Sequence, residues 1–299
     1  MKKIGRRNFI QKSARGLAGA VALGSGFSNM SFIPTGSATI DMVDLGKTGM
    51  KIPRLALGTG SHGWANTSNQ KKLGEKKFIQ LAKHAYDRGV RFFDTADMYG
   101  THELVGRALK EFQREEVTVL SKIMVYKHQD WYTPEPFQKS IDRFRKELDT
   151  DYIDILLLHC MVNSEWPDEY KRYMDAYSEA KEKGIIKKIG FSCHDLGALK
   201  VGAKSDWPDV LLARINHNGA KMDGPPSEIM QVLNEAQQSG KGVIGMKIFG
   251  CGDLVKDEQR EESLNYVLKS NNVHSMTIGM ENTEQVDDAV ERIMRIVKS

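Results

Sequence analysis

Four side chains that can bind or transfer protons stand where apolar stretches of the chain give way to polar loops. Asp94 ends an apolar run that begins at Val90, and Tyr99 follows five residues later. Lys122 and His159 end the next two apolar runs. Taken singly, each has a structural explanation, such as a helix cap, a packed ring or a solvated strand end. Together, at the ends of neighbouring parallel strands, they predict one site.

The chemistry of these four groups is complementary. A tyrosine hydroxyl has a pKa near ~10 and is a poor acid at neutral pH. A lysine ammonium close by favours the phenolate, and a carboxylate beside the lysine keeps it charged and in place. A histidine can orient a substrate oxygen by hydrogen bonding. The set suits protonation of a carbonyl oxygen as a hydride arrives at the carbonyl carbon.

The elements that must position these groups alternate regularly. Near-continuous apolar runs, typical of parallel strands covered on both faces, lie at 55–57, 90–93, 117–121, 153–158, 187–191, 210–215, 242–246 and 274–278. Stretches with apolar residues at three- and four-residue spacing separate them and predict helices. Eight such repeats are typical of an α/β fold of the (β/α)8 TIM-barrel type, which we assign to residues 39–299, with an N-terminal β-hairpin at 44–53.

A doubly wound open sheet is the alternative architecture. It normally carries a glycine-rich turn after its first strand. Residues 58–63 read Gly-Thr-Gly-Ser-His-Gly and fit the G-x-G-x-x-G pattern, but no helix is predicted directly after them. The pattern therefore favours the barrel.

Three segments around the candidate residues resemble the aldo-keto reductase family. Residues 94–109 resemble its signature, residues 120–122 its lysine-bearing strand and residues 151–159 its histidine-bearing strand. The similarity extends from about residue 42 to residue 298. It implies an oxidoreductase that transfers hydride between a nicotinamide cofactor and a small carbonyl or alcohol substrate. Within that resemblance, the catalytic residues are Tyr99 as general acid, Asp94 and Lys122 as the groups that tune it, and His159.

The resemblance also implies cofactor contacts. The positions are Gly58, Thr59, Ser192, Cys193, Arg214, His217, Lys247, Gly250, Gly279 and Gln285. Three depart from the family pattern, because Cys193 replaces an asparagine, Arg214 a glutamine and His217 a tyrosine that stacks on the nicotinamide. Histidine can also stack, and arginine can bind phosphate or carboxylate. Lys247 and Gly250 indicate a cationic turn for the pyrophosphate.

The cofactor is NADP or NAD. The family usually takes NADPH and often has serine and arginine at the positions of Glu281 and Asn282 for the 2′-phosphate. A carboxylate there repels a phosphate and suits a ribose hydroxyl. Resemblance and local chemistry point to different cofactors here.

The first 38 residues differ in composition from the rest. They contain six basic residues and no acid, so the remainder carries a net charge of −2 and gives no reason to expect nucleic acid as a partner. Arg6 and Arg7 precede an apolar run at 17–27 that is too short for a membrane span. The segment resembles a twin-arginine (Tat) export signal, with cleavage expected after Ala38. This predicts contact with the Tat machinery and a periplasmic or otherwise exported protein.

Two further interpretations stay open. The altered cofactor positions are compatible with a sensory protein that binds the nicotinamide cofactor without significant turnover. Alternatively, the cysteines and the histidines near them could form a metal or thiol site at the mouth of the barrel. These residues are Cys160, Cys193, Cys251, His159, His194 and His217. Small cysteines also fill apolar space, and the absence of a C-x-x-C pattern argues against a zinc ribbon or an iron–sulfur cluster.

Overall fold

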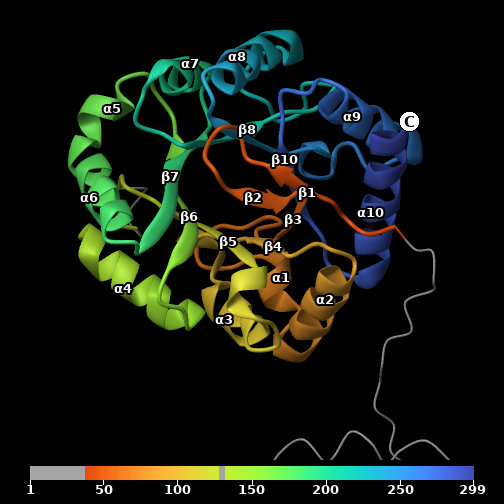
Figure 1. Cartoon of the computed structure of the whole chain (residues 1–299), viewed down its shortest axis with the longest axis horizontal. Coiled ribbons are helices and arrows are strands. Elements are labelled where there is room, and N and C mark those ends of the chain that lie inside the picture. Colours follow the sequence, from red (N-terminus) through yellow and green to blue (C-terminus); the bar gives the residue numbers. More distant parts are fainter. Residues whose placement is uncertain (1–37, 128–131) are drawn as a thin grey trace, which may run out of the picture. The chain divides into compact units, whose positions relative to one another are not determined.

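Eight parallel strands close into a barrel in the computed structural model of the protein (Figure 1). The structure describes residues 38–127 and 132–299, so the expected leader lies outside the described residues apart from Ala38. The barrel strands are β3 Leu55–Gly58, β4 Phe92–Asp94, β5 Thr118–Ile123, β6 Ile153–Met161, β7 Ile186–Cys193, β8 Val210–Arg214, β9 Gly242–Met246 and β10 Ser275–Gly279. Each pairs in parallel with its neighbours in chain order, and β10 closes against β3. The predicted (β/α)8 barrel is confirmed and the open sheet excluded.

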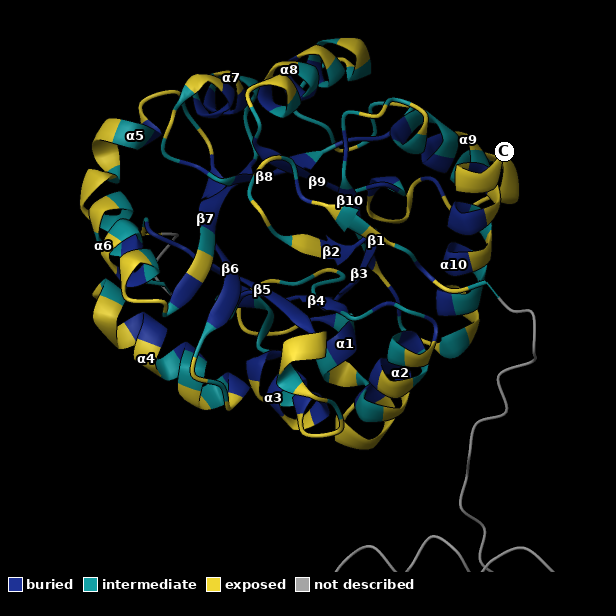
Figure 2. Cartoon of the chain, viewed as in Figure 1, coloured by how far each residue is buried: buried dark blue, intermediate teal, exposed yellow. Residues whose placement is uncertain are grey.

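The strands form because their side chains are buried on both faces. In β6, Ile155 and Leu157 point into the barrel, whereas Leu156 and Leu158 face the helices. The inner cluster is small and the outer cluster, between barrel and helices, is large. Figure 2 shows the barrel strands largely buried, apart from a segment of β7, and the exposed residues on the outer faces of the helices. This explains why the strands lack apolar–polar alternation.

The helices surround the barrel with amphipathic faces. They are α1 Asn69–Lys72, α2 Glu75–Asp87, α3 His102–Leu109, α4 Phe137–Leu148, α5 Trp166–Glu169, α6 Lys171–Glu182, α7 Leu196–Lys204, α8 Pro226–Gln238, α9 Asp257–Leu268 and α10 Thr283–Lys298. Short 3₁₀ turns lie at η2 Asp97–Tyr99, η3 Arg114–Glu116 and η4 Gly250–Gly252. In α4, Ile141, Phe144 and Leu148 are buried, as the helical spacing predicts. Within residues 38–127 and 132–299, none of the helices is both long and apolar enough to cross a bilayer.

The predicted hairpin closes one end of the barrel. Strands β1 Met42–Asp44 and β2 Lys51–Pro53 pair antiparallel and lie across the barrel in Figure 1. Leu45 and Ile52 are fully buried and belong to the inner cluster. A side chain at Gly242, the first residue of β9, would meet Leu45 at 2.5 Å. Because the hairpin occupies the end where the strands begin, the other end is left for chemistry.

Six of the eight barrel strands extend further than the apolar runs predict, among them the three that carry candidate residues. The expected ends at Phe93, Ser121 and Leu158 move to Asp94, Ile123 and Met161. The polar side chains at these ends mark no loop, because each strand continues its parallel ladder for one to three residues beyond the apolar run. The candidate residues Asp94, Lys122 and His159 therefore sit on strand backbone, which is more rigid than a loop.

Candidate active site

Tyr99 is held on a short turn between β4 and α3. It ends η2, and Gly100 follows in the left-handed region with a φ of 63°. The tyrosine ring lies directly against the loop after β3, because a Cβ added at Gly60 or Gly63 would come within 2.4 and 2.5 Å of ring atoms. These two glycines belong to the G-x-G-x-x-G pattern noted in the sequence. Their role in the structure is to make room for Tyr99.

Lys122 and Asp94 form a buried ion pair next to that ring. The Lys122 ammonium donates to the Asp94 carboxylate and, at 2.9 Å, to the backbone oxygen of Thr95. Both side chains are almost completely buried. The ammonium lies 4.9 Å from the centroid of the Tyr99 ring. The structure thus brings the predicted acid and the predicted tuning pair together.

His159 reaches the same place from β6. Its ring packs edge-on against Tyr99, with centroids 5.7 Å apart. The strand has a bulge between Leu158 and Met161, and Cys160 adopts a φ of 62°. The Cys160 amide donates to the Ser192 hydroxyl at 2.8 Å, and the Tyr126 hydroxyl donates to the Cys160 carbonyl at 3.0 Å. Such bulges redirect side chains next to active sites.

Burial dominates the electrostatics of the four groups. It raises the pKa of Tyr99 well above its ordinary value, and the Asp94 charge adds to the effect. Burial also lowers the pKa of Lys122, against the opposing effect of Asp94. Burial and then the charge of Lys122 lower the pKa of His159 well below the usual range, so its ring is neutral. The expected shift of Tyr99 toward phenolate is therefore wrong, because Asp94 compensates the Lys122 charge and the site is desolvated.

Three buried threonines fix the backbone around Asp94. The hydroxyl of Thr101 lies 2.8 Å from those of both Thr59 and Thr95. Thr59 also donates its hydroxyl, at 3.0 Å, and its amide, at 2.9 Å, to the carbonyl of Asp94. Thr59 is a predicted cofactor contact, but its hydroxyl and its amide both donate to β4, the strand that ends in Asp94. Nothing in the sequence pattern predicts this hydroxyl cluster.

The loop after β9 is a tight turn that is rich in left-handed backbone. Lys247, Gly250, Cys251 and Gly252 all have positive φ values. The amides of Gly250 and Gly252 donate within the turn, to the carbonyl of Lys247 at 2.8 Å and to that of Phe249 at 3.0 Å. No ion pair or hydrogen bond involves the Lys247 side chain in the part of the chain that the structure describes, so the turn combines this backbone with an uncompensated cation.

Asn216 ties this turn to the loop after β8. Its side-chain oxygen accepts from the amides of Asn218, Gly219 and Ala220, at 2.8 to 3.2 Å. Its amide group donates to the carbonyl of Lys247 at 3.0 Å. Asn216 is fully buried, and sequence reasoning missed it. A turn-forming asparagine three residues before Gly219 was the available signal.

The three positions that depart from the family pattern already have partners in the protein. The Cys193 thiol donates to the Asp195 carbonyl at 2.8 Å and packs in the outer cluster. Arg214 pairs with Asp223 at 3.0 Å, and burial raises the pKa of Asp223 to about 6. His217 pairs with Glu262 of α9 at 3.2 Å. Their spatial partners could not be read from the sequence.

The remaining predicted cofactor positions are built into the barrel rim. Gly58 and Gly279 face each other across β3 and β10. A Cβ at Gly279 would lie 2.1 Å from the Ser61 hydroxyl, so a larger residue there would displace Ser61 from its hydrogen bond with Gln70. The Gln285 side chain accepts from the Glu281 amide at 2.7 Å and thereby folds the loop before α10.

The metal or thiol interpretation gains no support. Cys160 lies 3.4 Å from the Nε2 atom of His194, but Cys193 packs elsewhere and Cys251 is exposed. Burial raises the pKa of Cys160 to about 12 and lowers that of His194 to about 3, so both are neutral. Among residues 38–127 and 132–299, no three histidine, cysteine or acidic side chains are arranged to hold a metal ion.

Comparison with known proteins agrees with the geometry. The chain is 24% identical to L-galactose dehydrogenase of Arabidopsis thaliana over 86% of its own length and 89% of that protein. It is 29% identical to aldo-keto reductase YhdN of Bacillus subtilis, over 51% of its length and 47% of that protein. The chain thus spans about half the length of several curated relatives that it matches.

A solved structure shares the fold. The holo form of aldo-keto reductase AKR11C1 from Bacillus halodurans superposes with a TM-score of 0.68 and 19% identity, covering 87% of this chain and 95% of that one. The sequence matches the family description "Aldo/keto reductase family" over residues 54–299, which include all eight barrel strands. This chain therefore belongs to the aldo/keto reductase family.

Proposed function

We propose that the protein is an NAD(P)-dependent oxidoreductase that reduces a small carbonyl compound, or oxidises the corresponding alcohol, with Tyr99 as the general acid. The observation that carries the proposal is the buried Asp94–Lys122 ion pair against the Tyr99 ring, with His159 at the edge of that ring. Family membership supports the oxidoreductase class.

The side chains divide the work as follows. A nicotinamide cofactor, when bound, would supply or accept the hydride. His159, which is neutral, can donate a hydrogen bond to the substrate oxygen and orient it. Tyr99 stays protonated because burial raises its pKa, so it has a proton to give to that oxygen. Lys122 stabilises the tyrosinate that remains, and Asp94 holds the Lys122 ammonium in place.

The residues present also fit a dinucleotide. The ammonium of Lys247, which begins a tight glycine-rich turn, offers a cation to a pyrophosphate. The Nδ1 atom of His159 is buried without a hydrogen-bond partner among the described residues, as expected for a site that a ligand completes. We propose Lys247 and this turn as the pyrophosphate contacts.

The direct test is to titrate freshly purified protein with NADH and NADPH, following quenching of tryptophan fluorescence. Carbonyl reduction is then assayed by loss of the reduced nicotinamide absorbance with a panel of aldehydes, ketones and sugars. Saturable binding with turnover supports the proposal. Binding without turnover on any substrate would favour a sensory role, and the absence of binding would refute the assignment.

Replacing Glu281 should change the choice of cofactor. Glu281 precedes α10 and accepts a hydrogen bond from Asn69 at 2.8 Å, which fixes its carboxylate at the rim. We propose that this charge disfavours the 2′-phosphate of NADP. Glu281→Gln should then raise the affinity for NADPH relative to NADH about five-fold, a size typical of a partly exposed charge. Glu284→Gln, an exposed neighbour, should leave the ratio unchanged. An unaltered ratio in Glu281→Gln would contradict the assignment.

We also propose that residues 1–38 direct export by the twin-arginine route, on the grounds of Arg6, Arg7 and the short apolar run after them. In a bacterial host, the full chain should reach the periplasmic fraction at a reduced molecular mass. The double variant Arg6→Lys, Arg7→Lys should stay in the cytoplasm at full length. Export of the double variant at the same level would argue against this route.

A further inference from the structure

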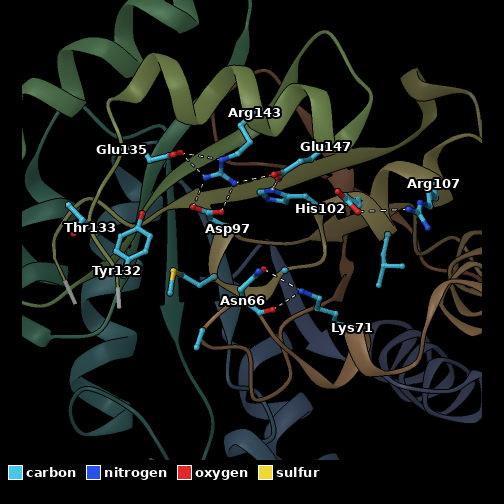
Figure 3. A pocket seen from close by; sticks show the side chains of 15 residues that line it. Asn66, Lys71, Asp97, His102, Arg107, Tyr132, Thr133, Glu135, Arg143 and Glu147 are labelled. Carbon is cyan, nitrogen blue, oxygen red and sulfur yellow. Dashed lines mark hydrogen bonds and ion pairs between the residues drawn. The ribbon is translucent and has the colours of Figure 1, made fainter. Parts of the chain in front are cut away.

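A network of ion pairs and hydrogen bonds between α3 and α4 begins two residues before Tyr99 (Figure 3). Arg143 of α4 stands at its centre. Its guanidinium binds both carboxylate oxygens of Asp97, with distances of 2.8 and 3.0 Å. Asp97 is the first residue of η2, and Tyr99 is the last. Two parallel charge-assisted hydrogen bonds fix the orientation of the turn as well as its position.

The other end of the network lies beside Lys122. Arg143 also binds Glu147 at 3.2 Å, and the second Glu147 oxygen lies 2.9 Å from His102. The far nitrogen of the His102 ring lies 2.8 Å from the hydroxyl of Ser121, which precedes Lys122 in β5. One continuous set of contacts therefore joins the turn of the acid to the strand of its lysine.

The Tyr99 turn depends on contacts from outside itself. It is a 3₁₀ turn of three residues, and no side chain caps its beginning. Short 3₁₀ segments have poor hydrogen-bond geometry and little stability of their own. Arg143 and Asp97 both line a cavity of about 690 Å³. The Arg143 side chain is 32% exposed, so water reaches it. Figure 3 shows Arg143 flanked by Glu135, Asp97 and Glu147 at that cavity.

We propose that Arg143 is a positioning residue for the general acid: it clamps Asp97 and so holds the η2 turn at the orientation from which the Tyr99 hydroxyl reaches the substrate oxygen. The inference rests on the proposed role of Tyr99. Arg143 acts on Tyr99 through the turn, by way of Asp97, and not by direct contact with the substrate. A displacement of about 1 Å in a reacting group can cost about 10²-fold in rate, so loosening the clamp should show in kcat.

The test compares Arg143→Met and Arg143→Lys with Arg145→Met on the same helix. Arg145 makes only long ion pairs, at 3.9 and 3.8 Å, and serves as the matched control. With saturating cofactor, Arg143→Met should lower kcat about 10- to 100-fold. KM and the cofactor Kd should stay within about two-fold. Arg143→Lys should recover only part of the loss, because lysine cannot bind both oxygens in a fork. Arg145→Met should behave like the unsubstituted protein.

Two further measurements separate positioning from general support of the fold. In a Tyr99→Phe background, Arg143→Met should cause no additional loss of the residual kcat, because both changes act on one group. An additive loss, or a fall in kcat that only follows the melting temperature, would overturn the proposal. The NMR signal of the labelled Tyr99 ring should also shift in Arg143→Met and stay fixed in Arg145→Met. This readout needs no turnover, so it is distinct from the test of the enzymatic function.

Discussion

Replacing Tyr99 by phenylalanine should lower kcat for carbonyl reduction by about 10²- to 10⁴-fold, the usual contribution of a positioned general acid. The substitution removes only the hydroxyl, so the ring still packs against Gly60 and Gly63. Titration with NADH or NADPH should give an unchanged Kd. A matched control is Tyr152→Phe, whose ring stacks under Arg114 before β6 begins. That variant should keep full activity.

The protonation states of Tyr99 and His159 also predict how kcat depends on pH. Burial raises the pKa of Tyr99 and lowers that of His159. The acid therefore stays protonated, and the histidine stays neutral, throughout the neutral range. The kcat for reduction should be flat there and fall only at alkaline pH, as Tyr99 loses its proton. Full turnover by Tyr99→Phe would contradict the role of Tyr99. A change in kcat near neutral pH that occurs in both the unsubstituted protein and Tyr99→Phe would contradict it as well.

Replacing Lys122 by methionine should cost both stability and activity. The change strands the Asp94 carboxylate in a buried site without its counter-ion. Removing one partner of a buried pair destabilises proteins by about 3–5 kcal/mol, which chemical denaturation would measure as a lower free energy of unfolding. Turnover should be lost as well. Lys171→Met, which breaks an exposed pair with Asp175, should cost less than about 1 kcal/mol.

A double variant separates the two effects. Adding Asp94→Asn to Lys122→Met removes the stranded charge, so much of the lost stability should return. Turnover should not return, because no cation is left to stabilise the tyrosinate. If the double variant regained activity, the ion pair would be a structural element only. If Lys122→Met proved as stable as the unsubstituted protein, the pair would not be buried as described.

The barrel could be predicted because its parallel strands are apolar on both faces and its helices carry one apolar side. Those patterns depend on residues close together in the chain. The convergence of Asp94, Lys122 and His159 followed from the topology alone, since successive parallel strands end at one rim. The strand ends cannot be predicted from polarity, because polar residues that face a site continue the strand ladder just as apolar ones do.

What could not be predicted depends on partners distant in sequence. The pairing of His217 with Glu262 joins residues 45 positions apart, and no local pattern marks it. The sign of the Tyr99 pKa shift was missed for a related reason, because burial outweighs the nearby charge and cannot be read from residue types. The Arg143–Asp97 clamp likewise joins residues 46 positions apart.

Gly60 and Gly63 place a sequence requirement on the loop after β3 that comes from Tyr99, a residue of the next loop. A single methyl group at either position would collide with the Tyr99 ring. Two positions in the loop after β3 are therefore fixed by an aromatic ring that belongs to the turn after β4. Adaptation to a new substrate has to leave this small area of bare backbone as it is.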